Sequence, residues 1–362
     1  MKIYLRSLLR TCFLALLLAL LLSLFFNKPI LLTNAAAQSS IPNSVEQAIK
    51  RSGIPKESIS IAVTEIPSTT NPIPAARTIM NWRDDIAMNP ASTIKLLTTL
   101  VALDILGPKY RWKTELFTDG AIKKGMLKGN IYFVGQGDPK WIPEELSELT
   151  KKLRNLGIQQ INGNLIFDRG AYTKQVMEDT TIDGETLRAY NVSPDPLLYA
   201  FRTLSFEINL NKNSDIANIV YTPKLARFKI DNQLKVISSP CNNPKNNIRF
   251  EIIPNPNEIN TSQLNNKSAI QWRAVFTGEI SRYCKNLSFN VVKFDPDTFL
   301  TLGFTAAWEE AGGKWSRPPN GQAGSVPIYA RPLLSYEGLT LLDASQDINK
   351  LSNNVMARQV FL

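Results

Sequence analysis

Two short motifs hold the residues of this chain that could do chemistry, and the first is Ser92-x-x-Lys95. It is the only Ser-x-x-Lys that we find in the sequence. On a helix, residues three apart share a face, so Lys95 would lie one turn above Ser92. A lysine can serve as the base for a serine nucleophile where burial or nearby positive charge lowers its pKa. The alternative is that Ser92 caps a helix and Lys95 is a surface residue.

The second motif is Ser352-Asn353-Asn354, near the end of the sequence. A Ser-x-Asn at a helix start places a hydroxyl and an amide close together. The hydroxyl could relay a proton with a lysine, and the amide could bind a substrate carbonyl. The alternative for Ser352 is a simple helix N-cap. A second Ser-x-Asn, Ser288 to Asn290, lies in a strand-like run, and we discount it.

The composition narrows the chemistry to a few residue types. The sequence contains no His, which excludes Ser-His-Asp and Cys-His hydrolases and His-ligated zinc enzymes. Its three cysteines, Cys12, Cys241 and Cys284, cannot build a Cys₄ zinc site or hold an iron–sulfur cluster. The hydrophobic share of 44% and charged share of 20% are ordinary for a globular protein. Any catalysis would therefore use Ser, Lys, Asp, Glu or Tyr.

The order of the two motifs resembles that of the class C low-molecular-mass penicillin-binding proteins, which are D-alanyl-D-alanine carboxypeptidase/endopeptidases. The segment Asn89–Leu96 resembles the family's nucleophile motif, and Ile348–Gln359 resembles its second motif. Between them, Val134–Pro139 is similar to the family's Gly-x-Gly-Asp-Pro segment. Read alone, that segment could suggest a phosphate loop, but no Gly-Lys-[Ser/Thr] follows it.

The resemblance implies a fold, a reaction and a set of roles. The fold class would be α/β, a serine β-lactamase/transpeptidase-like domain whose antiparallel sheet is sandwiched by helices, with an inserted largely β region. Ser92 would attack the penultimate D-Ala carbonyl of a peptidoglycan stem peptide, with Lys95 as base. Ser352 would relay a proton to the leaving D-Ala, and Asn354 would hold the substrate amide. The reaction needs no metal or organic cofactor, and β-lactams would be covalent inhibitors.

One departure from the family concerns its third motif, Lys-Thr-Gly, which lies downstream of Ser-x-Asn. No Lys-[Ser/Thr]-Gly occurs in the sequence, which stops eight residues after Asn354. A fragment, a frameshifted gene and a degenerate paralogue would each account for this, and we expect the 362 residues to have little or no peptidase activity. Two alternatives to a peptidase are a non-enzymatic, catalytically dead wall-binding protein and an extracytoplasmic solute-binding protein.

The first 37 residues have the pattern of a bacterial secretory signal peptide. Lys2, Arg6 and Arg10 precede the charge-free, Leu-rich run Thr11–Phe26, and Ala35–Ala37 offers a cleavage site. We therefore expect an exported, periplasmic protein, with a retained anchor and weak membrane association as the alternative. Cleavage would lower the net charge from +10 to +6 by removing two lysines and two arginines. That charge fits a solvated surface or an anionic wall polymer, and no basic run with aromatics suggests nucleic acid.

Export also changes what the cysteines imply. Cys241 and Cys284 would remain as a pair in a compartment that permits disulfides, so we expect a disulfide between them. Two unpaired thiols are the alternative.

The elements that must position the motifs divide the mature chain into three parts. The resemblance places the first part of the transpeptidase-like domain at 38–110, β-rich inserts at 111–286, and the second part of the domain at 287–362. The run Pro90–Leu106 predicts a helix that is apolar nearly all round and hence buried. Further helices are expected at Pro143–Leu156, Pro296–Ala311 and Leu351–Leu362. Alternation and turn residues predict strands at Ser58–Val63, Thr78–Asp84, Trp112–Phe117, Gly129–Val134, Gly163–Phe167, Ile216–Tyr221 and Ile248–Ile253.

Overall fold

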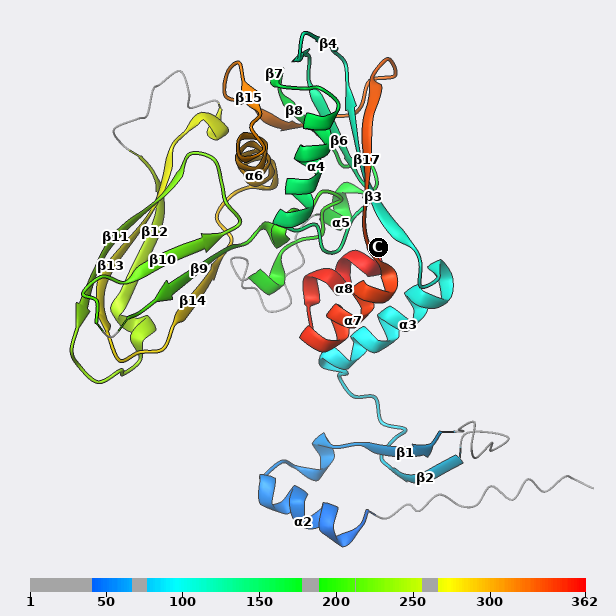
Figure 1. Cartoon of the computed structure of the whole chain (residues 1–362). Coiled ribbons are helices and arrows are strands. Elements are labelled where there is room, and N and C mark those ends of the chain that lie inside the picture. Colours follow the sequence, from blue (N-terminus) through cyan, green and yellow to red (C-terminus); the bar gives the residue numbers. More distant parts are fainter. Residues whose placement is uncertain (1–40, 67–76, 178–188, 212, 256–265) are drawn as a thin grey trace, which may run out of the picture. The chain divides into compact units, whose positions relative to one another are not determined.

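The chain forms two compact units, residues 1–90 and 91–362, in the computed structural model shown in Figure 1. The structure describes residues 41–66, 77–177, 189–211, 213–255 and 266–362. The expected signal peptide lies outside these ranges. Among the described residues, no helix is both long and apolar enough to span a bilayer.

The first unit is a helix followed by a hairpin. Helix α2 covers Asn43–Ser52, and strands β1 (Ile61–Glu65) and β2 (Arg77–Trp82) pair antiparallel. The two strands lie close to the ranges expected from alternation of polar and apolar residues.

A five-stranded sheet in the second unit has the order β16-β8-β6-β3-β17. Helices α4 (Pro143–Asn155) and α6 (Pro296–Glu310) pack against each other, with α4 also against β17 and α6 against β16. Strands from the same part of the chain also form a smaller four-stranded sheet, with the order β15-β7-β5-β4. Buried aromatic side chains fill the core here, including Phe133, Trp141, Phe167, Phe304 and Trp308. The strands of the two sheets are β3 (Arg111–Thr118), β4 (Ala121–Lys123), β5 (Met126–Lys128), β6 (Ile131–Gly135), β7 (Gln160–Asn162), β8 (Leu165–Asp168), β15 (Lys314–Trp315), β16 (Gly321–Ala323) and β17 (Arg331–Thr340).

Two three-stranded sheets, with the orders β10-β9-β14 and β11-β13-β12, form a separate β-rich lobe (Figure 1). Phenylalanine rings pack at its centre, where Phe206 contacts Phe228, Phe250 and Phe276. A disulfide joins Cys241 to Cys284, with their Cα atoms 5.0 Å apart. The strands are β9 (Leu204–Asn209), β10 (Asn218–Thr222), β11 (Phe228–Ile237), β12 (Ile248–Pro254), β13 (Trp272–Ser281) and β14 (Leu287–Val291).

Strand pairs link residues on both sides of the division expected at residue 287. Strand β14 begins at Leu287 and pairs with β9, so it completes a sheet of the β-rich lobe. Strands β16 and β17 pair with β8 and β3. The sheets that residues 111–286 begin are thus completed by later strands. Hydrogen-bond partners far along the chain decide this, and the local hydrophobic pattern does not contain that information.

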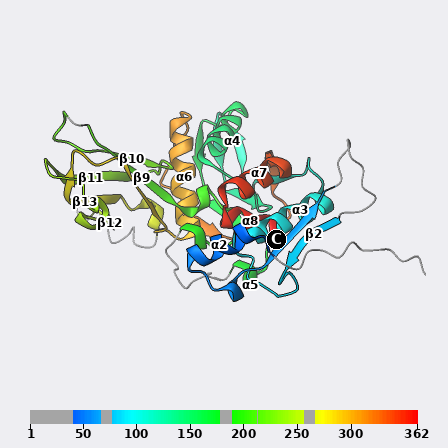
Figure 2. The ribbon, with the colours of Figure 1, turned by 90° about the horizontal axis from the view of Figure 1, so that it is seen from below.

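Three helices gather beside the start of β3: α3 (Ile94–Leu106), α7 (Leu341–Leu351) and α8 (Asn354–Phe361) (Figures 1 and 2). The last helix, expected over 351–362, thus begins at Asn354, and Leu351 ends the preceding helix α7, which was not predicted from the sequence. Helix α3 is also less buried than its composition predicts. Only Lys95, Thr99 and Ala102 of α3 are buried, and Ile105 is 73% exposed. The reason is that α7 and α8, its main contacts among the described residues, cover a single face.

Candidate active site

Ser92 lies in a short 3₁₀ turn, Ala91–Thr93, that leads directly into α3. Ala91 takes a left-handed backbone conformation, with φ of 45°, as the chain enters this turn. The Ser92 side chain is exposed, whereas Lys95, one turn later, is only 5% exposed. Ser92 therefore lies at the positive end of the α3 dipole, where a developing oxyanion would be stabilised.

The Lys95 ammonium group lies between two serine hydroxyls. Its Nζ donates to Ser92 Oγ at 3.0 Å and to Ser352 Oγ at 3.5 Å, across a separation of 257 residues. The structure therefore brings the two motifs together around the lysine. Lys95 is buried against α7 and α8 and is not a surface residue, which disfavours the alternative reading of Ser-x-x-Lys.

Burial lowers the pKa of the Lys95 side chain below its ordinary value. The cause is desolvation, which disfavours the charged ammonium. A lower pKa increases the fraction of neutral amine, and the neutral amine is the form that can accept a proton from Ser92.

A tight turn between α7 and α8 presents the Ser352 hydroxyl. Ser352 caps the C-terminus of α7 in the left-handed region, with φ of 52° and ψ of 39°. Asn353 then caps the N-terminus of α8, because its side chain accepts from Met356 N at 3.1 Å. The N-cap role that we considered for Ser352 therefore belongs to its neighbour.

Asn354 opens α8 and is half-buried. In the part of the chain that the structure describes, no hydrogen bond joins it to Ser92, Lys95 or Ser352. The discounted Ser-x-Asn lies in β14 of the β-rich lobe.

A polar contact one turn below Lys95 ties α3 to α7. Asn349 Nδ2 donates to Thr99 Oγ1 at 3.0 Å, and Thr99 Oγ1 donates to the Lys95 carbonyl oxygen at 2.9 Å. Thr99 is 3% exposed. The motifs alone did not predict this contact, although the spacing of the two residues along their helices indicates it. Thr99 is four residues after Lys95 and Asn349 is three before Ser352, so each shares a helix face with its motif residue.

Helix α8 is anchored by Gln359, another residue that the sequence reading did not assign. Gln359 is 1% exposed, and its amide makes two hydrogen bonds with the Asp195 backbone. Asp195 N donates to Gln359 Oε1 at 3.1 Å, and Gln359 Nε2 donates to Asp195 O at 2.9 Å. Arg169 in turn binds the carboxylates of Asp195 and Asp297 at 2.8 and 2.6 Å. These contacts fix the helix that follows Ser352.

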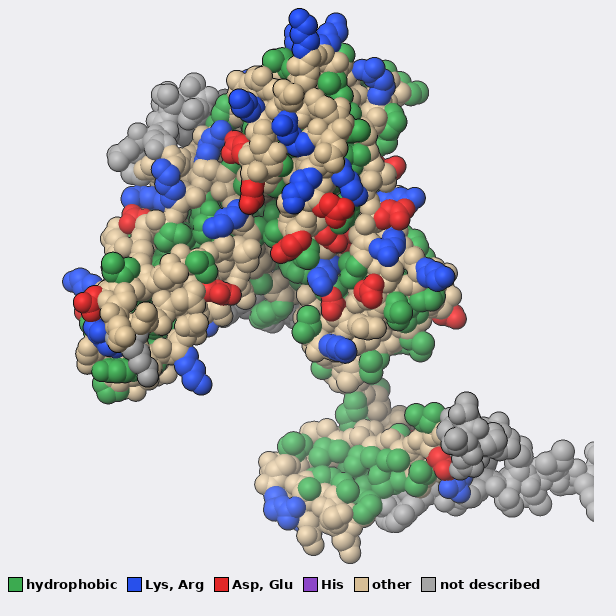
Figure 3. Space-filling view, in the orientation of Figure 1, with side chains coloured by type: hydrophobic (Ala, Val, Ile, Leu, Met, Phe, Trp, Pro, Cys, Tyr) green, Lys and Arg blue, Asp and Glu red, His purple; other side chains and the backbone are tan. Residues whose placement is uncertain are grey.

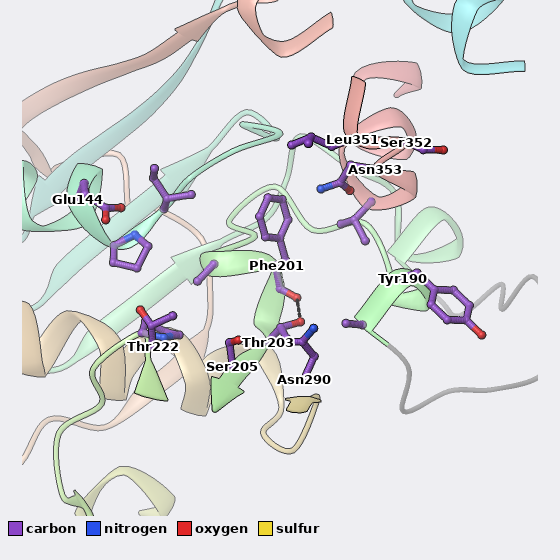
Figure 4. A pocket seen from close by; sticks show the side chains of 16 residues that line it. Glu144, Tyr190, Phe201, Thr203, Ser205, Thr222, Asn290, Leu351, Ser352 and Asn353 are labelled. Atoms are coloured by element: carbon purple, nitrogen blue, oxygen red, sulfur yellow. Dashed lines mark hydrogen bonds between the residues drawn. The ribbon is translucent and has the colours of Figure 1, made fainter. Parts of the chain in front are cut away.

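On the other side of the α7–α8 turn lies a cavity of about 550 Å³ (Figure 4). In the figure Asn353 faces the cavity and the Ser352 hydroxyl points away from it. Besides residues of the α7–α8 turn, its polar lining includes Glu144 at the α4 N-terminus and residues in or next to the β-rich lobe, namely Thr203, Ser205, Thr222 and Asn290. A volume of this size suits a small ligand or a short peptide segment.

The Gly-x-Gly-Asp-Pro segment forms a buried turn after β6. Gly137 has φ of 86°, and a Cβ atom there would come within 1.9 Å of Tyr172 Oη, so any other residue would be strained and would displace the Tyr172 side chain. Asp138 is 3% exposed, and burial raises the pKa of its carboxyl to about 6. Nearby, Lys140 Nζ binds Asp347 of α7 at 2.7 Å. The segment therefore has a structural role, and Lys140, the residue that follows it, binds the helix that leads to Ser352.

Among the described residues, no group of three or more His, Cys, Asp or Glu side chains could hold a metal ion.

Comparisons with known proteins agree with the geometry. Over 161 residues the chain is 26% identical to the D-alanyl-D-alanine carboxypeptidase DacB of Haemophilus influenzae, covering 44% of this chain and 34% of the relative. Over 98 residues it is 31% identical to the D-alanyl-D-alanine carboxypeptidase of an Actinomadura species, covering 27% of this chain and 16% of the relative. The chain thus matches about a third or less of the length of these curated relatives.

Solved structures show the same fold. The crystal structure of penicillin-binding protein 4 from Haemophilus influenzae covers 88% of this chain, with a TM-score of 0.57 and 21% identity, and the match spans 64% of that protein. A second structure of that protein, complexed with a β-lactam, matches with a TM-score of 0.54. The expected fold class is confirmed.

Residues 42–362, which include all of the motif residues named above, match the sequence pattern of one peptidase family. The resemblance read from the motifs is therefore confirmed, and the chain belongs to the D-Ala-D-Ala carboxypeptidase 3 (S13) family.

Proposed function

We propose that this chain is a serine-type D-Ala-D-Ala carboxypeptidase or endopeptidase that acts on peptidoglycan stem peptides through an acyl-enzyme on Ser92. The observation that carries the proposal is the buried Lys95 amine, within hydrogen-bond reach of Ser92 Oγ at 3.0 Å and Ser352 Oγ at 3.5 Å. Family membership and the names of the curated relatives support the same reaction.

Each of the motif residues has its own role in the proposed acylation and hydrolysis. Lys95 takes the Ser92 hydroxyl proton as Ser92 Oγ attacks the penultimate D-Ala carbonyl carbon. Ser352 passes a proton from Lys95 to the departing D-Ala nitrogen, and the carbon–nitrogen bond breaks. Asn354 holds the substrate amide. Water then attacks the acyl carbon and gives a proton to Lys95, the bond from that carbon to Ser92 Oγ breaks, and Lys95 returns the proton to Ser92 Oγ as the shortened peptide leaves.

The proposal also includes where the protein lies in the cell and what inhibits it. The leader-like first 37 residues support export to the periplasm, and a retained leader would give weak membrane association. The relative solved in complex with a β-lactam supports covalent inhibition by this class of drug. Mass determination of the secreted chain tests the first point, because cleavage after Ala37 leaves Gln38 as the first residue.

Labelling with a fluorescent penicillin tests the chemistry, because only an acylating serine gives a stable adduct. Because no Lys-[Ser/Thr]-Gly occurs in the sequence, the labelling compares the 362 residues with a chain extended by a relative's Lys-Thr-Gly segment. We expect little labelling of the unextended chain. In the extended chain we expect the adduct on Ser92 by peptide mapping, and its loss in Ser92→Ala and Lys95→Ala. Ser352→Ala should slow labelling. Ser288→Ala, a change in the other Ser-x-Asn, is the matched control and should label as the parent does.

Two results would contradict the proposal. An adduct on Ser352, or full labelling of Ser92→Ala, would show that the nucleophile is misassigned. A folded chain that binds isolated peptidoglycan but takes no label under any condition would be the non-enzymatic wall-binding protein considered above.

A further inference from the structure

The active-site helices lie at one end of the five-stranded sheet, and a hairpin and a loop lie at the other end. Strand β3 starts at Arg111 beside the helices of the active site and ends at Thr118. Strand β17 runs the other way, with Arg331 opposite Thr118 and Thr340 opposite Arg111. The far end of the sheet therefore holds the β4–β5 hairpin and the loop before β17 (Figure 1). An eight-residue strand separates the two ends by about 27 Å.

Apolar side chains are unusually exposed at this far end. Ile328 and Tyr329, in the loop before β17, are 103% and 70% exposed. Ile122 in the hairpin is 41% exposed. A fully exposed isoleucine next to an exposed tyrosine makes no contribution to the core, and Tyr is a residue type that favours the interface between lipid and water.

Positively charged side chains lie on the same hairpin as Ile122 and at the start of β17, directly after the loop that holds Ile328 and Tyr329. Lys123 and Lys124 form the tip of the hairpin and Lys128 lies on its second strand, and all three are exposed. Arg331 Nη2 donates to the Gly120 carbonyl oxygen at 2.7 Å, which ties the β17 loop to the hairpin. Figure 3 shows the lysine and arginine side chains at this tip with hydrophobic side chains beside them.

The one acidic residue of this hairpin region does not offset that charge at the surface. Asp119 accepts hydrogen bonds from Asn130 N, Asn130 Nδ2 and Tyr132 Oη, at 2.7 to 2.9 Å. Its carboxylate is therefore engaged within the protein. We call the exposed set the hairpin patch, and its members are Ile122, Lys123, Lys124, Lys128, Ile328, Tyr329 and Arg331.

We propose that the hairpin patch docks the folded protein on the surface of an anionic lipid bilayer. Lysine and arginine would lie against lipid phosphates, while Ile328 and Tyr329 would enter the headgroup layer. An anionic wall polymer would account for the charge alone, whereas a bilayer accounts for the charge and for the exposed apolar tip together. The docking does not depend on the chemistry proposed for Ser92. It would hold the Ser92 end of the sheet away from the bilayer.

Sedimentation with lipid vesicles tests the proposal, using a chain that starts at Gln38 so that the apolar leader is absent. We expect binding to vesicles of phosphatidylcholine mixed with phosphatidylglycerol, and much weaker binding to phosphatidylcholine alone. Lys123→Gln with Lys124→Gln should weaken binding by about 25-fold, from about fivefold for each lysine at an anionic surface. Ile328→Ser with Tyr329→Ser should also weaken it, and a polarity-sensitive dye on Ile328→Cys should shift to the blue on binding.

Matched controls come from the β-rich lobe. Lys235→Gln with Lys285→Gln removes two other exposed lysines, and Ile216→Ser with Tyr283→Ser replaces side chains that are 73% and 59% exposed. Both pairs should bind vesicles as the parent does, and circular dichroism checks that every variant is folded. Equal loss in patch and control variants would overturn the proposal. So would binding to an anionic wall polymer without binding to vesicles, because the partner would then be that polymer.

Discussion

The contact between Asn349 and Thr99 should couple the two catalytic motifs, and a double-mutant cycle can measure that coupling. The changes are Asn349→Leu and Thr99→Val, alone and together, each close in volume to the original residue. In Asn349→Leu, Thr99 Oγ1 keeps its bonds to the carbonyl oxygens of Lys95 and Leu96, at 2.9 and 3.2 Å. Only the bond across the two helices, at 3.0 Å, is lost.

The expected size of the effect follows from the burial of the two groups. A neutral hydrogen bond contributes about 0.5–1.5 kcal/mol to stability, and leaving a buried partner unpaired costs about 1–3 kcal/mol. Thr99 is 3% exposed, whereas Asn349 is exposed, so the cost falls mainly on Thr99. We therefore expect each single change to lower the free energy of unfolding by about 1–2 kcal/mol. The double mutant should lose less than the sum, with a coupling of about 1 kcal/mol.

The same coupling between Asn349 and Thr99 should appear in the rate at which Ser92 is acylated. Lys95 Nζ lies 3.5 Å from Ser352 Oγ, at the outer limit of a hydrogen bond, so a small shift of α7 would break the contact. Loss of about 1.4 kcal/mol of positioning would slow labelling by a fluorescent penicillin about tenfold. Urea unfolding measures the first quantity and the labelling rate measures the second.

Two results would refute this reasoning. Additive losses of stability, within about 0.3 kcal/mol, would show that the two side chains do not interact. Normal labelling in Asn349→Leu, together with reduced stability, would show that the contact stabilises the fold without aligning Ser352.

Further predictions concern the disulfide, a buried acid and a glycine. Replacing Cys241 and Cys284 by serine opens a loop of 43 residues and should lower the free energy of unfolding by about 2–4 kcal/mol, whereas equal urea midpoints would show no disulfide in solution. Burial raises the pKa of Glu145 from 4.5 to about 8, so its folded form keeps a proton that the unfolded chain releases, and stability should fall as pH rises across that range. Glu145→Gln should flatten this dependence in melting curves, and an unchanged slope would contradict the assignment. Gly137→Ala should cost more than Gly157→Ala, since both have positive φ but only Gly137 lacks room for a Cβ atom; equal melting temperatures would contradict this.

Much of the local structure could be predicted from sequence. The helix that starts near Pro90 is present as a 3₁₀ turn and α3, and α4 and α6 begin where Pro143 and Pro296 predict. Proline at the first helical position and periodic apolar residues are local signals, so they predict a helix without any knowledge of the rest of the fold. The motif residues Ser92, Lys95 and Ser352 were chosen in the same way, from residue types and spacing.

What the sequence could not show depends on partners far along the chain. No glycine marks the left-handed turn at Ser352, where α7 ends, so the last helix, α8, begins at Asn354 and not at Leu351 as expected. Helix α7 itself was not predicted. The exposed face of α3 is another case, because composition reports that a side chain is apolar but not whether a neighbour covers it. The pairing of β14 with β9 is a third, since a strand pattern does not name its partner.

The position of the site follows from one strand ladder and two helix lengths. Strand β3 begins soon after α3 ends, and β17 ends immediately before α7, so their antiparallel pairing places the end of α3 beside the start of α7. Leu341 N donates to the Tyr110 carbonyl oxygen at 2.8 Å at this junction. Helices of 13 and 11 residues are about 20 and 17 Å long, so the start of α3 returns to the level of the end of α7. Ser92 and Lys95 at one helix end therefore meet Ser352 at the other, whatever the length of the segments inserted between β3 and β17.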